Sequence, residues 1–542
     1  MAAVALHFDL PPLQDRVAVI VRPAEIAAWL ERLPMLNTAE TSRALLERLA
    51  QLNRQPVEDD VRLKLIELLR EPIHGMCLSL IAAYENLPLP LAGPAKVAAD
   101  RVQELYGELA NGYKRLAMTV SQRVHTTPAQ RDVAALCMQR AIHCLARLLG
   151  AHYGRYLTPP AGTWHDLHGL YGYAEAEGIA DAPVPDPLNP RGTASSVSHV
   201  YKQALLLGFA DPYHLPPRMI EKVYRYLDAM APLAQVTRAV PALRADCQFV
   251  MDLATDHAGV SDAETHAVTA EARYRFLNTV ALAHAMHRQF TALQSGTAPE
   301  LHGLASDFFA PNGADMLTRL LVAWGVHPKR RFPRMARNQL PVMVYVGLEA
   351  ICRLANHDLP FERSSNIVGP MPRPPDRPVD SIEAADPANR AASGASWELL
   401  DESAGGFSLG RTSAPAQPVH VGDMIGARRE GRSGNFDVAT VRWVMHTPDG
   451  ALRIGVQRLA PSAATVGIAP ADAPESEFHV VLRLPAIAAL QQPETLITPR
   501  GVFRPDRALV LDDGSRTHRI VATRLVNITG AFEHFQFRFG GT

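Results

Sequence analysis

The sequence has few of the features that mark secreted or membrane proteins. It contains five cysteines in 542 residues, an odd number with no C-x-x-C pair, so a disulfide framework is not expected. The N-terminus has no basic start followed by an apolar core, and no apolar run approaches the roughly 20 residues that span a bilayer. These absences predict a cytoplasmic protein without a membrane span.

The chain also lacks a large net charge of either sign. The 54 basic and 55 acidic residues leave a formal charge of −1, so no overall field draws the chain to nucleic acid or to a membrane surface. The sequence contains no nucleophile elbow, Walker loop, zinc signature or kinase motif set. We therefore expect a protein that is not an enzyme, with no catalytic residue and no cofactor.

Histidine and cysteine do not gather into an evident metal site. His165 and His168 stand three residues apart and could share a metal, but a third ligand is not evident and zinc sites need three or four. Cys137 and Cys144 would share one helical face, where small buried hydrophobic side chains are the better interpretation. We expect no metal.

The length favours two to four domains, and the first three-fifths of the chain has a helical pattern. The segment Asn37-Thr38-Ala39-Glu40 offers a helix cap ahead of a run of leucines that fall on one helical face. This pattern predicts an all-α antiparallel array or bundle over residues 1–325, with one strand-like interlude at 248–253. Later helices are expected at 93–125, 128–156, 163–178, 192–208, 216–231, 268–293 and 312–325.

After residue 340 the pattern changes to short strands. Residues 363–395 are rich in proline, serine, alanine and charge without periodicity, which predicts a disordered insertion. Strand patterns then follow at 419–426, 438–444 and 452–457, with Asp449-Gly450 as a hairpin turn, and they predict a β-domain over residues 326–465.

A second β-region covers residues 476–542, where Asp512-Asp513-Gly514 marks a hairpin. It could form a barrel of its own, or it could pack on the preceding domain and cover a sheet edge. We favour a separate small β-module.

Two short motifs lie on either side of the insertion. Arg330 and Arg334 form R-x-x-x-R, with Arg331 between them. Arginine meets a phosphate with a fork of donors and also stacks flat on a purine. Several arginines on one segment could therefore wrap a compact anionic ligand.

The second motif is D-x-S-x-x-G, formed by Asp401, Ser403 and Gly406. A carboxylate can accept hydrogen bonds from the N–H donors of guanine, and a hydroxyl can bond to phosphate or base. Glycine allows the backbone to turn and to approach a ligand closely. Neither motif is specific alone, whereas the ordered pair followed by strands is a strong signal.

In this order, and ahead of these strands, the two motifs resemble the ligand site of a PilZ domain. The segments Val421-Gly422-Asp423, Val441-Arg442-Trp443-Val444 and Ile454-Gly455-Val456-Gln457 also resemble strands of that family. The resemblance covers about residues 326–462, roughly a quarter of the chain. It implies a six-stranded antiparallel β-barrel that binds the bacterial second messenger cyclic di-GMP.

The fold class expected is therefore multidomain α + β: the helical array, then a PilZ-type barrel, then the small C-terminal β-module. The resemblance implies a non-catalytic cyclic di-GMP receptor, or effector, in bacterial signal transduction. The ligand-binding residues that it implies are Arg330, Arg331, Arg334, Asp401, Ser403 and Gly406. The arginine segment would order around the ligand and alter the packing of the barrel against the helical region, which would present a surface to a protein partner.

The chain departs from the family pattern at two points. Pro333 stands inside R-x-x-x-R, where it fixes one backbone angle and removes one donor. The gap between the motifs is also longer than is usual, because of the insertion, but each doubling of a loop costs only about 0.6 kcal/mol. The long insertion affects access to the site and leaves the expected fold unchanged.

Two other functions remain open. One is a ligand-independent scaffold that uses the PilZ fold as a docking module, although the retained arginines and Asp401 argue against it. The other is nucleic-acid binding through the C-terminal β-region, which is not expected because Phe503 alone would supply base stacking there. The basic residues of that region are Arg500, Arg504, Arg507, Arg516 and Arg519.

Overall fold

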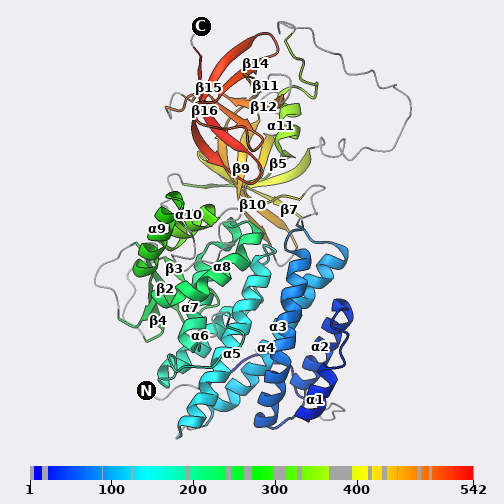
Figure 1. The fold of residues 1–542 in the computed structure, drawn as a ribbon, viewed down its shortest axis with the longest axis vertical. Helices are drawn as coiled ribbons and strands as arrows, with labels where there is room; N and C mark the ends of the chain where they lie inside the picture. Colours follow the sequence, from blue (N-terminus) through cyan, green and yellow to red (C-terminus); the bar gives the residue numbers. More distant parts are fainter. Residues whose placement is uncertain are drawn as a thin grey trace, which may run out of the picture. The chain divides into compact units, whose positions relative to one another are not determined.

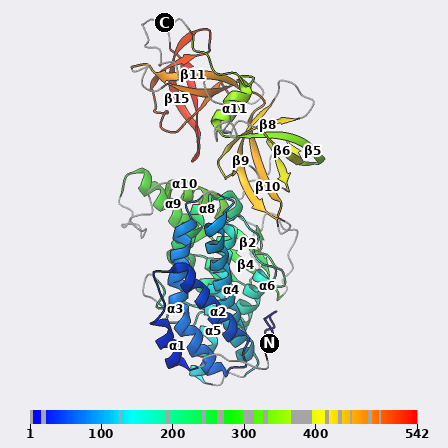
Figure 2. The ribbon, with the colours of Figure 1, turned by 90° about the vertical axis from the view of Figure 1, so that its right-hand side faces the viewer.

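The structure, a computed structural model, divides into two compact units, Met1–Lys329 and Arg330–Thr542 (Figure 1, Figure 2). Each unit is considered by itself below. The residues described are 5–14, 22–87, 89–123, 127–189, 194–239, 246–261, 272–297, 313–325, 333–364, 394–412, 418–429, 436–447, 450–472, 478–487 and 491–540.

The first unit is mainly helical, as the sequence predicts. Asn37 caps its second helix by accepting a hydrogen bond from the backbone N–H of Glu40 at 3.2 Å, which confirms the expected cap. The helices are α1 (Pro23–Leu30), α2 (Thr38–Asn53), α3 (Asp59–Tyr84), α4 (Gly93–Ser121), α5 (Pro128–Tyr153), α6 (Thr163–Ala176), α7 (Val197–Phe209), α8 (Pro217–Met230), α9 (Val280–Gln294) and α10 (Gly313–Trp324).

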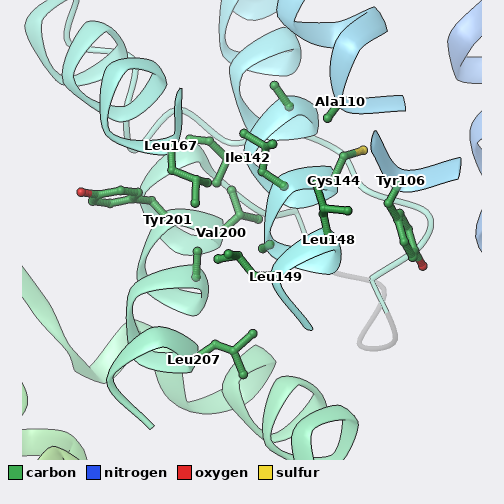
Figure 3. Close-up of a cluster of buried hydrophobic side chains, with 14 of the residues drawn as sticks. Tyr106, Ala110, Ile142, Cys144, Leu148, Leu149, Leu167, Val200, Tyr201 and Leu207 are labelled. Atoms are coloured by element: carbon green, nitrogen blue, oxygen red, sulfur yellow. The ribbon is translucent and has the colours of Figure 1, made fainter. Parts of the chain in front are cut away.

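Helix α5 lies at the centre of this unit. By length and composition, α5 is the one helix in the described part of the chain that could cross a membrane. However, 78% of its most apolar 18-residue segment is buried inside the unit. Figure 3 shows its side chains Ile142 and Leu149 among residues of α4, α6 and α7, such as Leu167 and Val200. Its apolar composition is thus explained by a core position between neighbouring helices.

The helical unit also contains a small antiparallel sheet that the sequence indicated only as one interlude. Its strands lie in the order β1-β4-β2-β3. They are β1 (Gln235–Thr237), β2 (Gln248–Asp252), β3 (Val260–Ser261) and β4 (Tyr274–Asn278). The helix expected at 268–293 begins only at Val280, because residues 274–278 pair with β2 and bury Arg275 against Glu175 of α6 at 2.5 Å. Tertiary pairing here overrides the local helical pattern.

The second unit consists of two closed six-stranded barrels, which confirms the multidomain α + β class. The first barrel closes in the order β10-β7-β6-β5-β8-β9, and a helix, α11 (Leu348–Ala355), follows β5. Its strands are β5 (Met335–Val346), β6 (Ala395–Ser403), β7 (Gly406–Arg411), β8 (Met424–Arg429), β9 (Asp437–His446) and β10 (Leu452–Ala460).

Two of the segments that resemble the PilZ pattern are matched to each other across β9 and β10. Gly455 pairs with Trp443 in the antiparallel ladder. A Cβ atom at Gly455 would lie 1.9 Å from the indole nitrogen of Trp443, so only glycine leaves room for that ring.

The second barrel closes in the order β11-β12-β13-β16-β15-β14. Its first strand starts at Ala464, before the expected start of the C-terminal module at residue 476. Its strands are β11 (Ala464–Pro470), β12 (His479–Leu484), β13 (Thr495–Thr498), β14 (Ala508–Asp512), β15 (Thr517–Ile528) and β16 (Glu533–Phe539).

The two barrels share an apolar cluster. Ile351 of α11 and Met424 of β8 belong to the same buried cluster as Leu482, Ile497 and Phe532 of the second barrel. The second barrel is therefore closed on itself, as favoured, and is also packed on the first through this cluster, but it covers no sheet edge because the first barrel is closed as well.

Most of the expected disordered insertion, residues 365–393, lies outside the described residues. Its first two residues are placed against the second barrel. The guanidinium of Arg363 stands 4.0 Å from the ring centroid of Phe478, and the backbone N–H of Ser364 donates to Asp512 at 3.0 Å. These contacts fix the chain where it leaves the barrel pair.

The helical unit contains a buried cluster of ion pairs, and its contribution to the free energy of unfolding can be tested. Asp186 has a side chain only 5% exposed and pairs with Arg70 at 2.8 Å and Arg140 at 3.2 Å. We expect Asp186→Asn to lower the free energy of unfolding by about 3 kcal/mol, because it leaves the buried guanidinium of Arg70 without its carboxylate partner, whereas Arg140 keeps Glu67. Urea unfolding followed by circular dichroism at 222 nm measures this loss.

The matched control is Glu47→Gln, which removes an exposed carboxylate paired with Arg43 along α2. That change should cost less than about 0.5 kcal/mol. Equal unfolding midpoints for the Asp186 and Glu47 variants would contradict the assignment.

Candidate ligand-binding site

The D-x-S-x-x-G motif forms the end of the β6–β7 hairpin. Ser403 pairs with Gly406 across the two strands, so Ala404 and Gly405 make the turn. The Ser403 hydroxyl donates a hydrogen bond to the Gly406 carbonyl oxygen at 3.2 Å. The motif is thus a tight hairpin in which Asp401 precedes the turn by two residues.

Gly406 has a packing reason as well as a motif reason. A Cβ atom at this position would lie 2.1 Å from the carbonyl oxygen of Val456 on β10. Its φ is not in the left-handed region, so the close approach of β10, rather than the turn, requires glycine here.

Arg334 brings the second anchor of R-x-x-x-R to the hairpin. It stands one residue before β5, and its Nη1 donates to both carboxylate oxygens of Asp401, at 2.8 and 3.2 Å. The two side chains are 37% and 29% exposed, so the pair adds less than about 1 kcal/mol of stability. The contact shows that Arg334 and Asp401, which are 67 positions apart in the sequence, lie next to each other in the structure. Arg330 and Arg331 lie outside the described residues.

Beside this pair lies an ion cluster that the sequence did not reveal. Glu402, the residue after Asp401, accepts hydrogen bonds from Arg337 of β5 at 3.2 Å, from Arg429 of β8 and from Arg458 of β10 at 3.1 Å. Asp437 of β9 accepts from Arg458 as well, at 2.9 Å. In the sequence, the only sign of this cluster was Glu402 itself, between Asp401 and Ser403. The three arginines come from strands whose register cannot be read from sequence.

The cluster controls the ionisation of Glu402. Burial raises the pKa of Glu402, but hydrogen bonds and charge from Arg429, Arg458 and Arg337 outweigh burial and lower the pKa to about 2. Glu402 is therefore a permanent anion at neutral pH.

Among the described residues of these ion pairs, positive charges exceed negative charges by one. The described arginines are Arg334, Arg337, Arg429 and Arg458, against the acids Asp401, Glu402 and Asp437. Such an excess favours an anionic ligand near the hairpin, where Asp401 and Ser403 can bond to the edge of a base.

Metal ligation has no support in the described part of the chain. No group of three or more histidine, cysteine or acidic residues lies close enough there to hold an ion. His168 is buried, and its ring nitrogens bond to the Tyr201 hydroxyl at 2.7 Å and the His257 carbonyl at 2.9 Å, so it is a structural residue. Burial lowers its pKa to about 4, which keeps the ring neutral.

Comparison with known proteins agrees with this geometry. Residues 373–465 match the family model described as the middle PilZ domain of the cyclic-di-GMP receptor FimW. The first barrel is a PilZ domain. Residues 24–242 match the N-terminal domain of the same receptor, and residues 465–539 match its C-terminal β-barrel domain.

A curated relative covers nearly all of the chain. The cyclic-di-GMP receptor FimW of Pseudomonas aeruginosa is 24% identical over 592 aligned residues, which include 98% of this chain and 93% of the relative. No solved structure matches the chain. The PilZ match begins at residue 373, after β5, so the arginine segment that precedes β5 lies outside the matched range.

The low pKa of Glu402 makes barrel stability depend on pH. The folded state holds this carboxylate deprotonated down to about pH 2, whereas the unfolded chain takes up the proton near pH 4.5. The stability contributed by Glu402 is thus fully present above pH 4.5 and is lost as pH falls toward 2. We expect Glu402→Gln to lower barrel stability at pH 7 and to flatten its decline over this acid range.

Urea unfolding at several pH values measures both effects. Glu398→Gln is the control, because Glu398 is an exposed residue of the same strand. An acid decline as steep in the Glu402 variant as in the unaltered protein would refute the role given to the arginine cluster.

Proposed function

We propose that this chain is a non-catalytic cyclic di-GMP receptor, acting in the cytoplasm as an effector of bacterial second-messenger signalling. The observation that carries the proposal is the Arg334–Asp401 contact, which joins the two ligand motifs on a PilZ barrel. The similarity of the chain to the receptor FimW over nearly its full length supports the same ligand.

The proposed ligand residues have complementary roles. Arg330, Arg331 and Arg334 would bind the phosphodiesters and stack on guanine, as forked cationic donors do. A carboxylate has about four lone-pair positions, and Arg334 takes up one on each oxygen of Asp401. The other positions can accept the N1–H and N2–H donors of guanine. Ser403 would bond to phosphate or base.

Gly406 would let the ligand approach the hairpin closely, in addition to its packing against β10. Removal of that glycine is therefore a poor test of ligand contact, because a side chain there also collides with the barrel.

The output would pass through the helical region. We assign residues 1–325 to a partner-binding domain and the receptor barrel to the region from residue 326 to the end of β10, with the C-terminal module beginning at β11 rather than at the expected residue 476. The arginine segment lies where the two compact units meet along the chain, at Lys329 and Arg330. A ligand that orders this segment would alter the packing of the two units to the extent that its affinity differs between the packed and unpacked states. A protein partner would then read that change, with no role for nucleic acid.

Calorimetric titration of the full chain with cyclic di-GMP tests the proposal. We expect micromolar or tighter binding. Arg334→Ala and Asp401→Asn should each weaken it by at least about tenfold, because each removes a charged hydrogen bond to the ligand. The double variant Arg330→Ala/Arg334→Ala should abolish it. Arg453→Ala is the matched control, since this exposed arginine lies on β10 outside both motifs.

Cyclic di-AMP serves as the control ligand, because adenine lacks the N1–H and N2–H donors that Asp401 would accept. Failure of the unaltered chain to bind cyclic di-GMP would overturn the receptor function. The ligand-independent scaffold would then be the better account.

A further inference from the structure

One residue holds the backbone of the ligand hairpin at three successive positions. The guanidinium of Arg458 donates through Nη1 to the carbonyl oxygens of Ser403, at 3.3 Å, and Ala404, at 3.1 Å. Its backbone N–H donates to the carbonyl oxygen of Gly405 at 3.0 Å. Three consecutive carbonyl groups of the D-x-S-x-x-G turn therefore accept hydrogen bonds from Arg458.

The guanidinium is itself fixed from the other side. Its Nε and Nη2 donate to the two carboxylate oxygens of Asp437, at 2.9 and 3.2 Å, and Nη2 also donates to Glu402 at 3.1 Å. The group stands 5.6 Å from the ring centroid of Phe407, and the side chain is only 20% exposed. Arg458 is thus a rigid bridge between the hairpin and β9.

We propose that Arg458 is a positioning residue for ligand recognition, which sets the β6–β7 hairpin so that Asp401 and Ser403 can meet cyclic di-GMP. The inference rests on the proposed function and adds to it a residue outside both motifs. Arg458 has five N–H donors on its guanidinium, and the five bonds described above engage them. No donor is left over for a phosphate, so the residue acts through the hairpin.

The benefit to binding is preorganisation. The hairpin turn contains Ala404 and Gly405, small residues that do not themselves fix a conformation. Neighbouring side chains on a strand point to opposite faces, so anchoring Glu402 to the arginine cluster directs Asp401 to the other face. When the turn is already ordered before the ligand binds, less conformational entropy is lost on binding, and the affinity is higher.

The first test compares matched lysine variants in the full chain by calorimetric titration with cyclic di-GMP. Arg458→Lys keeps the charge but cannot bridge both carbonyl groups and both carboxylates, because lysine is a point charge without a planar fork. We expect the dissociation constant to rise about tenfold, equal to about 1.4 kcal/mol. Arg453→Lys is the control, since this exposed arginine lies on the same strand but outside the ion cluster, and should change the constant less than about twofold.

Salt dependence separates positioning from direct ligand contact. The neutral variant Arg458→Gln removes the positive charge, and if Arg458 only positions the hairpin, the dissociation constant of this variant should change with salt as that of the unaltered chain does. An altered salt dependence would show that Arg458 touches a phosphate, and would overturn the positioning role. Binding by Arg458→Lys as tight as in the unaltered chain would overturn it too.

A double-variant cycle separates positioning from a general loss of structure. With Asp401→Asn in the background, Arg458→Lys should cost less than it does in the unaltered chain, because the hairpin no longer presents the carboxylate. Additive losses would mean that Arg458 stabilises only the fold, and would refute the proposal. Should Arg458→Lys fail to give a folded melting transition, Asp437→Asn releases the guanidinium from the β9 side and should weaken binding in the same direction. Unchanged binding in that variant would also refute the proposal.

These outcomes remain distinct from failure of the proposed function. If the unaltered chain does not bind cyclic di-GMP, the receptor function and the role of Arg458 fall together. If it binds and the Arg458 variants bind equally well, only the inference on Arg458 is wrong.

Discussion

The end of the PilZ barrel at the β6–β7 hairpin depends on the carboxylate of Glu402. It joins β6 to β5, β8 and β10 through Arg337, Arg429 and Arg458, and two of those strands are not its ladder neighbours. Hydrogen bonds of the sheet fix only adjacent strands, so this carboxylate adds a constraint across the barrel. The side chain is 13% exposed, and partial exclusion of water strengthens such charged contacts. Arg334 and the D-x-S-x-x-G hairpin lie beside the constrained end.

The two units use charge differently. In the helical unit, Asp186 and its arginines are enclosed among packed helices, where their loss leaves an unpaired charge. In the PilZ barrel, the arginines surround Glu402, which solvent still reaches, and Arg334 pairs separately with Asp401. The first arrangement neutralises charge inside a packed core. The second joins strands that the sheet does not pair directly.

The sequence predicted the parts of the fold that local pattern controls. Alternation and turn residues identified the strands at 438–444 and 452–457, and the ordered motifs identified the family. Register and tertiary pairing were beyond its reach. Glu402 and Arg458 are brought together only by barrel closure, and β4 is a strand because β2 pairs with it. The small residues of β11 lie mostly outside the expected β-regions, and they form a strand because two neighbours complete its ladders.

The link between the barrels has a mechanical consequence. Only residues 461–463 separate the end of β10 from the start of β11, and the apolar cluster around Phe532 joins the barrels on another side. This short connection and the shared core keep the two barrels within one compact unit. Arg458 lies two residues before β10 ends. The strand that anchors the hairpin is therefore also the strand that leads directly into the second barrel.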